Sequence, residues 1–181
     1  MSLKITYFVH GTTVDNENNK SSGWNDAQLS DLGVQQSKDL TKLTKDMNFD
    51  AVFTSDLSRA VDSAYFTWGD KYPKFQDKRL RECNYGDMNG KNSEIVEPMQ
   101  EKSITRPMPN GESYEDVKRR MEDFLKDIKT KYDGKHIAIV AHKAPQLAVD
   151  VLVKGETWDE ALANDCRKTK SGRPGWEYII D

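Results

Sequence analysis

The stretch Leu3-Lys-Ile-Thr-Tyr-Phe-Val9 runs directly into His10 and Gly11. Its apolar, β-rich composition and its length predict a buried strand that ends at the histidine. Ligands bind at the carboxyl ends of strands in open α/β sheets, so this strand places His10 at a candidate binding edge. Gly11 allows a sharp turn there, and Thr13 adds a hydroxyl group beside it. On this stretch alone, a structural histidine bonded to the backbone is the simpler interpretation.

The composition indicates a soluble globular protein with one domain over residues 1–181. The chain is 36% hydrophobic and 31% charged, and its length is sufficient for a sizeable core. We expect a cytoplasmic protein without a membrane partner, because no apolar run has spanning length and no signal peptide precedes the first strand. The formal charge of −3 gives no general support for a nucleic-acid partner, although a local pocket can still bind a small anion. Two cysteines are too few for a disulfide framework.

A second strand and helix are expected at 49–55 and 56–66. A strand, small polar residues and then a helix are an arrangement that directs backbone amides at a bound anion. Arg59 falls in the first turn of this helix, where a positive side chain opposes the helix dipole. Its position favours an anionic partner, and an ordinary exposed arginine is the alternative.

A third strand, expected at 136–141, ends in His142 and Lys143, and Pro145 suits the first position of the next helix. In a parallel, doubly wound sheet, His10, Arg59 and His142 emerge at the same edge. The sequence therefore predicts an α/β three-layer sandwich, with a doubly wound, mostly parallel sheet flanked by helices.

The remaining elements complete this α/β pattern. We expect Leu32, Leu40, Leu43 and Met47 to form the core face of a helix that Ser30 caps. A connector is expected at 72–78, a cap or lid over one face at about 91–110, a long helix after a capping box at 113–116, a short helix at 157–164 and a last strand at 176–180.

Glu82 lies among basic and apolar neighbours just before a turn that contains Gly86. This setting can bury a carboxyl group and favour its protonated form, although a surface ion pair is the simpler interpretation of a lone glutamate. Together with two histidines and an arginine, such a carboxyl group suits phosphoryl transfer. One imidazole can attack phosphorus, the other and the guanidinium can hold oxygens, and the carboxyl group can protonate the leaving oxygen without a metal or other cofactor.

These motifs, taken in order, resemble those of the histidine phosphatase superfamily, the phosphoglycerate mutase-like enzymes. Each piece is weak alone, but the ordered set extends through nearly the whole chain. The matching motifs are His10-Gly11-Thr12-Thr13 with Asn16, Ser22-Gly23-Trp24, Leu29-Ser30-Asp31-Leu32-Gly33, Ser55-Asp56-Leu57-Ser58-Arg59-Ala60, Leu80-Arg81-Glu82-Cys83-Asn84-Tyr85-Gly86-Asp87, Gly111-Glu112-Ser113 and Ile139-Val140-Ala141-His142.

The resemblance implies a role for each matched residue. His10 would be the nucleophile that becomes phosphohistidine, and Glu82 the proton donor and later the base toward water. Arg59 and His142 would bind the transferred phosphoryl group. The phosphate pocket would be completed by Gly11, Thr13, Asn16, Ser22 and Gly23.

Two positions depart from the family pattern. Val9 stands where the family normally has an arginine. Loss of the bidentate phosphate contact of that guanidinium can cost about 2 to 5 kcal/mol of transition-state stabilisation if nothing replaces it. Lys143 stands where the family usually has a glycine. We hypothesise that Lys143 supplies the missing positive charge, although a lysine lacks the fork geometry. A solvent-facing Lys143 is the alternative.

Other phosphate chemistries fit less well. Cys166 and Arg173 have six residues between them, where a cysteine phosphatase needs five. The segment from Gly86 to Lys91 is one residue too short for a P-loop, and no strand precedes it. The three histidines lack metal-ligand spacing, and His136 is interpreted as structural.

The sequence thus favours a phosphatase that hydrolyses a small phosphomonoester through phosphohistidine. A mutase is the second hypothesis. A degenerate member that binds a phosphorylated ligand or a protein without turnover is the third, and a homodimer is possible in each case.

Overall fold

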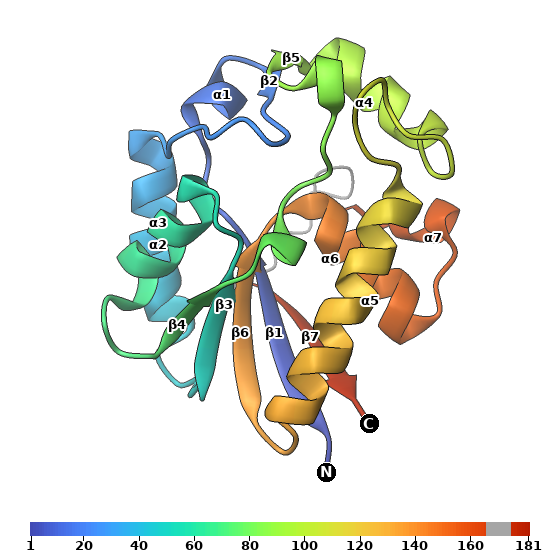
Figure 1. Ribbon diagram of the computed structural model, residues 1–181. Coiled ribbons are helices and arrows are strands. Elements are labelled where there is room, and N and C mark those ends of the chain that lie inside the picture. The colour runs from blue at the N-terminus through green and yellow to red at the C-terminus, as the bar shows by residue number, and fades with distance from the viewer. Residues whose placement is uncertain (166–174) are drawn as a thin grey trace.

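The computed structural model describes residues 1–165 and 175–181, which form a central sheet between two layers of helices (Figure 1). The sheet order is β4-β3-β6-β1-β7. Four of these strands are parallel, and β7 runs antiparallel to β1 at one edge. The strands are β1 (Leu3–Val9), β3 (Ala51–Thr54), β4 (Lys74–Gln76), β6 (His136–Ala141) and β7 (Trp176–Ile180).

Helices cover both faces of the sheet, which confirms the predicted three-layer α/β sandwich (Figure 1). One layer contains α2 (Asp31–Leu43) and α3 (Ser58–Trp68). The other contains α5 (Tyr114–Lys131), α6 (Lys143–Val149), which continues as the π-helix η3 (Asp150–Lys154), and α7 (Trp158–Ala163). None of the helices in the described part of the chain is long and apolar enough to cross a membrane.

Alternate side chains of β6 enter the core on opposite faces of the sheet, so both faces need a covering layer of helices. Ile137 and Ile139 point into the larger core cluster, which α5, α6 and α7 cover. Ala138 and Val140 point into the smaller cluster, where Trp68 of α3 packs. A strand that is buried on both faces gives a continuous apolar run, and this explains why the sequence predicts β6 and β1 well.

The core face predicted for α2 is confirmed for Leu40 and Met47, which pack against the smaller core cluster, and is wrong for Leu32 and Leu43. Leu32 is 52% exposed and Leu43 is 61% exposed, whereas Gly33 and Ser37 are buried. The reason is the close approach of α2 to its neighbours, since a Cβ atom on Gly33 would lie 2.0 Å from the carbonyl oxygen of Thr12. Small residues therefore form this tight contact in place of Leu32 and Leu43.

Other boundaries also differ from the expectation. The connector expected at 72–78 contains the edge strand β4. Lys143 begins α6, so Pro145 lies inside the first turn and His142 is the N-cap residue. The capping box of α5 at Ser113 and Asp116 is confirmed.

Short elements gather above the carboxyl edge of the sheet (Figure 1). The polar loop after His10 contains α1 (Val14–Glu17) and β2 (Lys20–Ser21), and β2 pairs with β5 (Lys91–Asn92). The expected cap segment contains β5 and α4 (Ser93–Lys102). Two 3₁₀ turns, η1 (Lys78–Leu80) and η2 (Gly86–Met88), flank the turn that carries Glu82.

Candidate active site

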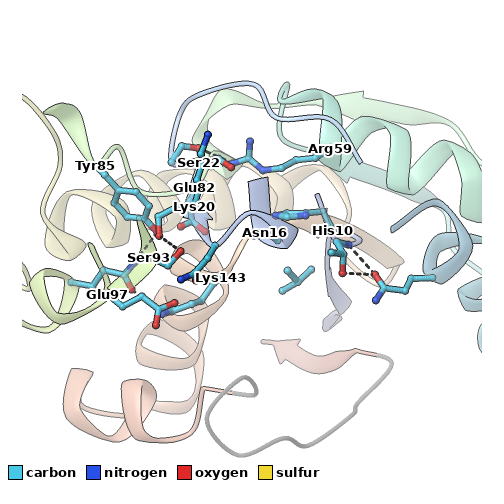
Figure 2. Close-up of a pocket in the computed structure, with 17 residues that line it drawn as sticks. His10, Asn16, Lys20, Ser22, Arg59, Glu82, Tyr85, Ser93, Glu97 and Lys143 are labelled. Carbon is cyan, nitrogen blue, oxygen red and sulfur yellow. Dashed lines mark hydrogen bonds between the residues drawn. The ribbon is translucent and has the colours of Figure 1, made fainter. Parts of the chain in front are cut away.

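The parallel strands β1, β3 and β6 are neighbours, and their carboxyl ends deliver His10, Ser55 and His142 to one place. A cavity of about 500 Å³ opens beside His10 (Figure 2). Most of the site residues predicted from the sequence line it: His10, Asn16, Ser22, Gly23, Arg59, Glu82 and Lys143.

A hydrogen bond to the backbone of the next residue orients the imidazole of His10. Its Nδ1 atom lies 2.7 Å from the carbonyl oxygen of Gly11. Because a carbonyl oxygen can only accept, Nδ1 carries the proton, and the neutral ring has its lone pair on Nε2. Gly11 is required by packing and not by a positive φ, since a Cβ atom there would lie 2.5 Å from the carbonyl oxygen of Gly33. The amide of Gly11 donates to Ser63 Oγ.

His142 is completely buried and is not part of the cavity lining, and its ring packs edge-on against the ring of His10 with the centroids 5.1 Å apart. The hydroxyl group of Tyr7 accepts from the backbone amide of His142 and donates to its carbonyl oxygen. Burial lowers the pKa of His142 well below its usual value, and the positive charge of Arg59 lowers it further. His142 is therefore a neutral imidazole at pH 7.

Arg59 provides a buried positive charge at the start of α3. The residue is 2% exposed, and its guanidinium donates to the carbonyl oxygens of Asn25 at 2.9 Å and Gly23 at 2.7 Å. Burial lowers the pKa of Arg59, and the nearby Glu82 opposes this effect. The guanidinium stays charged, because its ordinary pKa lies far above neutrality.

Glu82 is 8% exposed, so the surface ion pair is excluded. Its Oε1 atom accepts from the backbone amides of Cys83 at 2.8 Å and Ala144 at 3.1 Å. Its carbonyl oxygen accepts from the side chains of Trp24 and Arg120. Two amides thus hold the carboxyl group at the cavity wall, and two side chains hold the backbone that carries it.

The loop after His10 supplies further polar groups. Thr13 is fully buried and lies outside the cavity lining, where it caps α1. Its amide donates to Asn16 Oδ1, so the Nδ2 end of Asn16 is the end suited to an anion. Ser22 donates to Asp15. Gly23 has φ +55°, and a Cβ atom there would lie 1.9 Å from Asn89 Oδ1, so another residue would strain the backbone and displace Asn89.

Lys143 faces the cavity, but its charge is shared. Nζ lies 3.1 Å from Asp165 Oδ2 and donates to Gln100 Oε1 at 3.0 Å. Its side chain is only 13% exposed, so the solvent-facing alternative is wrong. Val9 also lines the cavity.

Sequence reasoning missed several residues that line the cavity. Ser93, Glu97 and Gln100 come from α4, and their spacing of four and three residues puts them on one helix face. This spacing was the signal that could have identified them. Figure 2 shows Ser93, Glu97 and Tyr85 on the side of the cavity away from His10.

Two further predictions concern residues outside this site. His136 lies at the start of β6, where its Nε2 atom is 2.8 Å from Thr6 Oγ1. This contact agrees with a structural histidine. Cys166 and Arg173 lie outside the described residues.

Residues 7–164 match the family model of the histidine phosphatase superfamily (branch 1). The chain belongs to this superfamily, as its fold and its motifs indicated.

Individual relatives include both mutases and phosphatases. A 2,3-bisphosphoglycerate-dependent phosphoglycerate mutase from Allorhizobium ampelinum is 32% identical, and the match covers 90% of this chain and 87% of that protein. Among solved structures, Bacillus stearothermophilus YhfR is 26% identical with a TM-score of 0.78, covering 88% of this chain and 83% of that one. The alpha-ribazole phosphatase from Shigella flexneri is 25% identical with a TM-score of 0.74, covering 90% and 84%.

Proposed function

We propose that the protein is a phosphatase that hydrolyses a small phosphomonoester in two steps through phosphohistidine. In the first step, the lone pair of His10 Nε2 attacks phosphorus, the bond from phosphorus to the ester oxygen breaks, and protonated Glu82 gives its proton to that oxygen. In the second step, the Glu82 carboxylate takes a proton from water, the oxygen attacks phosphorus, and the bond to Nε2 breaks. Inorganic phosphate is released and both residues return to their starting state.

The orientation of His10 is the observation that carries this proposal. The hydrogen bond from Nδ1 to Gly11 puts the lone pair on Nε2, in a cavity that also contains a buried guanidinium and a buried carboxyl group. A nucleophile, a cation and an acid in one cavity are what phosphoryl transfer requires.

Arg59 stabilises the phosphoryl charge in this scheme. Two backbone carbonyl oxygens hold its guanidinium before substrate arrives, so little reorganisation is needed during the reaction. His142 donates a hydrogen bond to a phosphoryl oxygen, and Asn16, Ser22 and the Gly23 backbone surround the remaining oxygens. Gly11 and Thr13 act indirectly: Gly11 fixes His10, and Thr13 fixes Asn16.

The cap helix α4 favours hydrolysis over mutase chemistry. A mutase must bind a substrate with a second anionic group. The face of α4 at the cavity provides Ser93, Glu97 and Gln100, which include a carboxylate and no cation. The lining lysines, Lys20 and Lys143, come from β2 and α6, and Nζ of Lys143 is paired with Asp165. The Allorhizobium mutase at 32% identity favours phosphoglycerate mutase as the second candidate.

The test combines turnover with trapping of the intermediate. The protein is incubated with p-nitrophenyl phosphate, and separately with 3-phosphoglycerate and its bisphosphate, and acid-labile phosphate is mapped. We expect phosphate release and label on His10, loss of both in His10→Ala, and retention of both in the matched control His136→Gln. Isomerisation faster than hydrolysis would support the mutase. Absence of both turnover and label, with orthovanadate still bound, would support a non-catalytic binding protein.

A further inference from the structure

A buried serine contacts the second histidine of the site. Ser55 directly follows β3, is 0% exposed, and places its Oγ atom 2.6 Å from Nε2 of His142. The backbone amide of Leu57 donates to the same Oγ atom at 3.4 Å. Ser55, Leu57 and His142 are all absent from the cavity lining, and His142 contacts both Ser55 and the ring of His10, which does line the cavity.

The buried hydroxyl group of Ser55 indicates which nitrogen of His142 carries the proton. Among the described residues, Nε2 of His142 is the acceptor within hydrogen-bond distance of the Ser55 hydroxyl proton, and a protonated Nε2 would leave that buried proton without an acceptor. An accepting Nε2 in a neutral imidazole requires a proton on Nδ1. The lowered pKa of His142 agrees with a neutral ring.

Nδ1 of His142 is buried and has no hydrogen-bond partner among the described residues. A buried N–H group without an acceptor is costly, and such a group in a native structure requires an explanation. The ring lies next to His10, where the phosphoryl group would be transferred, so a phosphoryl oxygen is a suitable acceptor.

We propose that Ser55 is a positioning residue that holds His142 in the neutral Nδ1–H tautomer, so that Nδ1 donates to the transferring phosphoryl group. This inference rests on the proposed function. The arrangement gives the site a neutral donor next to Arg59, where burial and the guanidinium both oppose an imidazolium.

The first experiment measures the tautomer without any need for turnover. Long-range ¹H–¹⁵N correlation spectra of the full chain at pH 7.5 report which ring nitrogen is protonated, and His142→Gln assigns the signals. We expect the Nδ1–H tautomer in the wild type and a substantial Nε2–H fraction in Ser55→Ala. A wild-type ring protonated on Nε2, or a tautomer that Ser55→Ala leaves unchanged, would overturn the proposal.

The second experiment compares Ser55→Ala with Ser55→Thr, which keeps a hydroxyl group. We expect Ser55→Ala to lower kcat/KM for p-nitrophenyl phosphate by about 10- to 100-fold, mainly through kcat, and to weaken orthovanadate inhibition by a similar factor. Ser55→Thr should recover both to within about threefold of the wild type. The matched control is Ser37→Ala, which removes another buried serine hydroxyl and should change neither.

Full activity and inhibition in a folded Ser55→Ala protein would overturn the proposal. If Ser55→Ala fails to fold, Ser55→Thr and the wild-type spectrum still decide between the two tautomers. If the wild type releases no phosphate, the proposed function fails, whereas the tautomer and the effect on orthovanadate binding still test the role of Ser55.

Discussion

Glu82→Gln separates the chemical role of the carboxyl group from its structural role. A glutamine keeps the Oε1 acceptor for the amides of Cys83 and Ala144 but has no proton to give at neutral pH. We therefore expect the free energy of unfolding to change by less than about 1 kcal/mol. Glu82→Ala, in contrast, leaves two buried amides unpaired, at about 1 to 3 kcal/mol each.

The kinetic effect of Glu82→Gln should depend on the leaving group. General acid catalysis typically contributes about 10²- to 10⁴-fold, or about 2.7 to 5.4 kcal/mol. We expect a loss of this size in kcat/KM for glycerol phosphate, whose alkoxide needs a proton, and a much smaller loss for p-nitrophenyl phosphate. Because the same residue acts as the base in the second step, the phosphoenzyme should accumulate with the nitrophenyl ester.

Steady-state rates with both esters and rapid-quench measurement of the acid-labile phosphate check these outcomes. Equal losses for the two esters, or no loss for either, would refute the assignment of Glu82 as the acid.

Three further predictions follow from single contacts. Lys143→Ala should lower kcat/KM about tenfold and weaken orthovanadate inhibition. The exposed control Lys102→Ala should change neither. Unchanged kinetics in Lys143→Ala would rule out the hypothesis that Lys143 compensates for the missing arginine. Because burial lowers the pKa of His142, the unfolded chain binds a proton below about pH 6.5 that the folded chain does not bind. The free energy of unfolding, measured with urea, should therefore fall by up to about 1.4 kcal/mol for each pH unit as the pH is lowered from about 6.5 to 5. His142→Gln should reduce this slope, and an identical slope would contradict the pKa direction. Gly33→Ala should destabilise the fold by about 1 to 3 kcal/mol, because its Cβ atom would meet the carbonyl oxygen of Thr12; a change below 0.5 kcal/mol in a urea titration would contradict the packing.

The fold could be predicted where burial leaves a pattern in the sequence. β1 and β6 are buried on both faces and are therefore continuous apolar runs, and α5 has a capping box and a regular apolar face. β4 could not be predicted, because three residues at a sheet edge carry little pattern. The predicted face of α2 was wrong at Leu32 and Leu43 because periodicity follows the large apolar residues, whereas the tight contact needs Gly33 and Ser37.

The site likewise contains residues whose positions the sequence predicts and residues whose positions it does not predict. His10, Arg59 and His142 follow strands, and the topology of a parallel sheet is enough to bring them together. The apolar neighbours of Glu82 made burial one of two interpretations, but the amide of Ala144 that binds its carboxyl group is distant in sequence, so only the family resemblance favoured burial over a surface ion pair. The polar face of α4 was missed because the spacing of Ser93, Glu97 and Gln100 predicts a shared helix face but does not show that this face lies over the cavity.

The departure at Val9 determines how the phosphoryl charge must be stabilised. Lys143 reaches the cavity from α6, but its Nζ atom is paired with Asp165, which is 2% exposed, and is also bound by Gln100. A carboxylate at 3.1 Å reduces the positive potential that Lys143 presents to an anion, and a lysine cannot form the two parallel bonds of a guanidinium. Arg59, in contrast, is held by two neutral carbonyl oxygens, which orient its charge without cancelling it. In the proposed reaction, Arg59 therefore provides most of the transition-state stabilisation, and Lys143 acts as a weaker, adjustable contact.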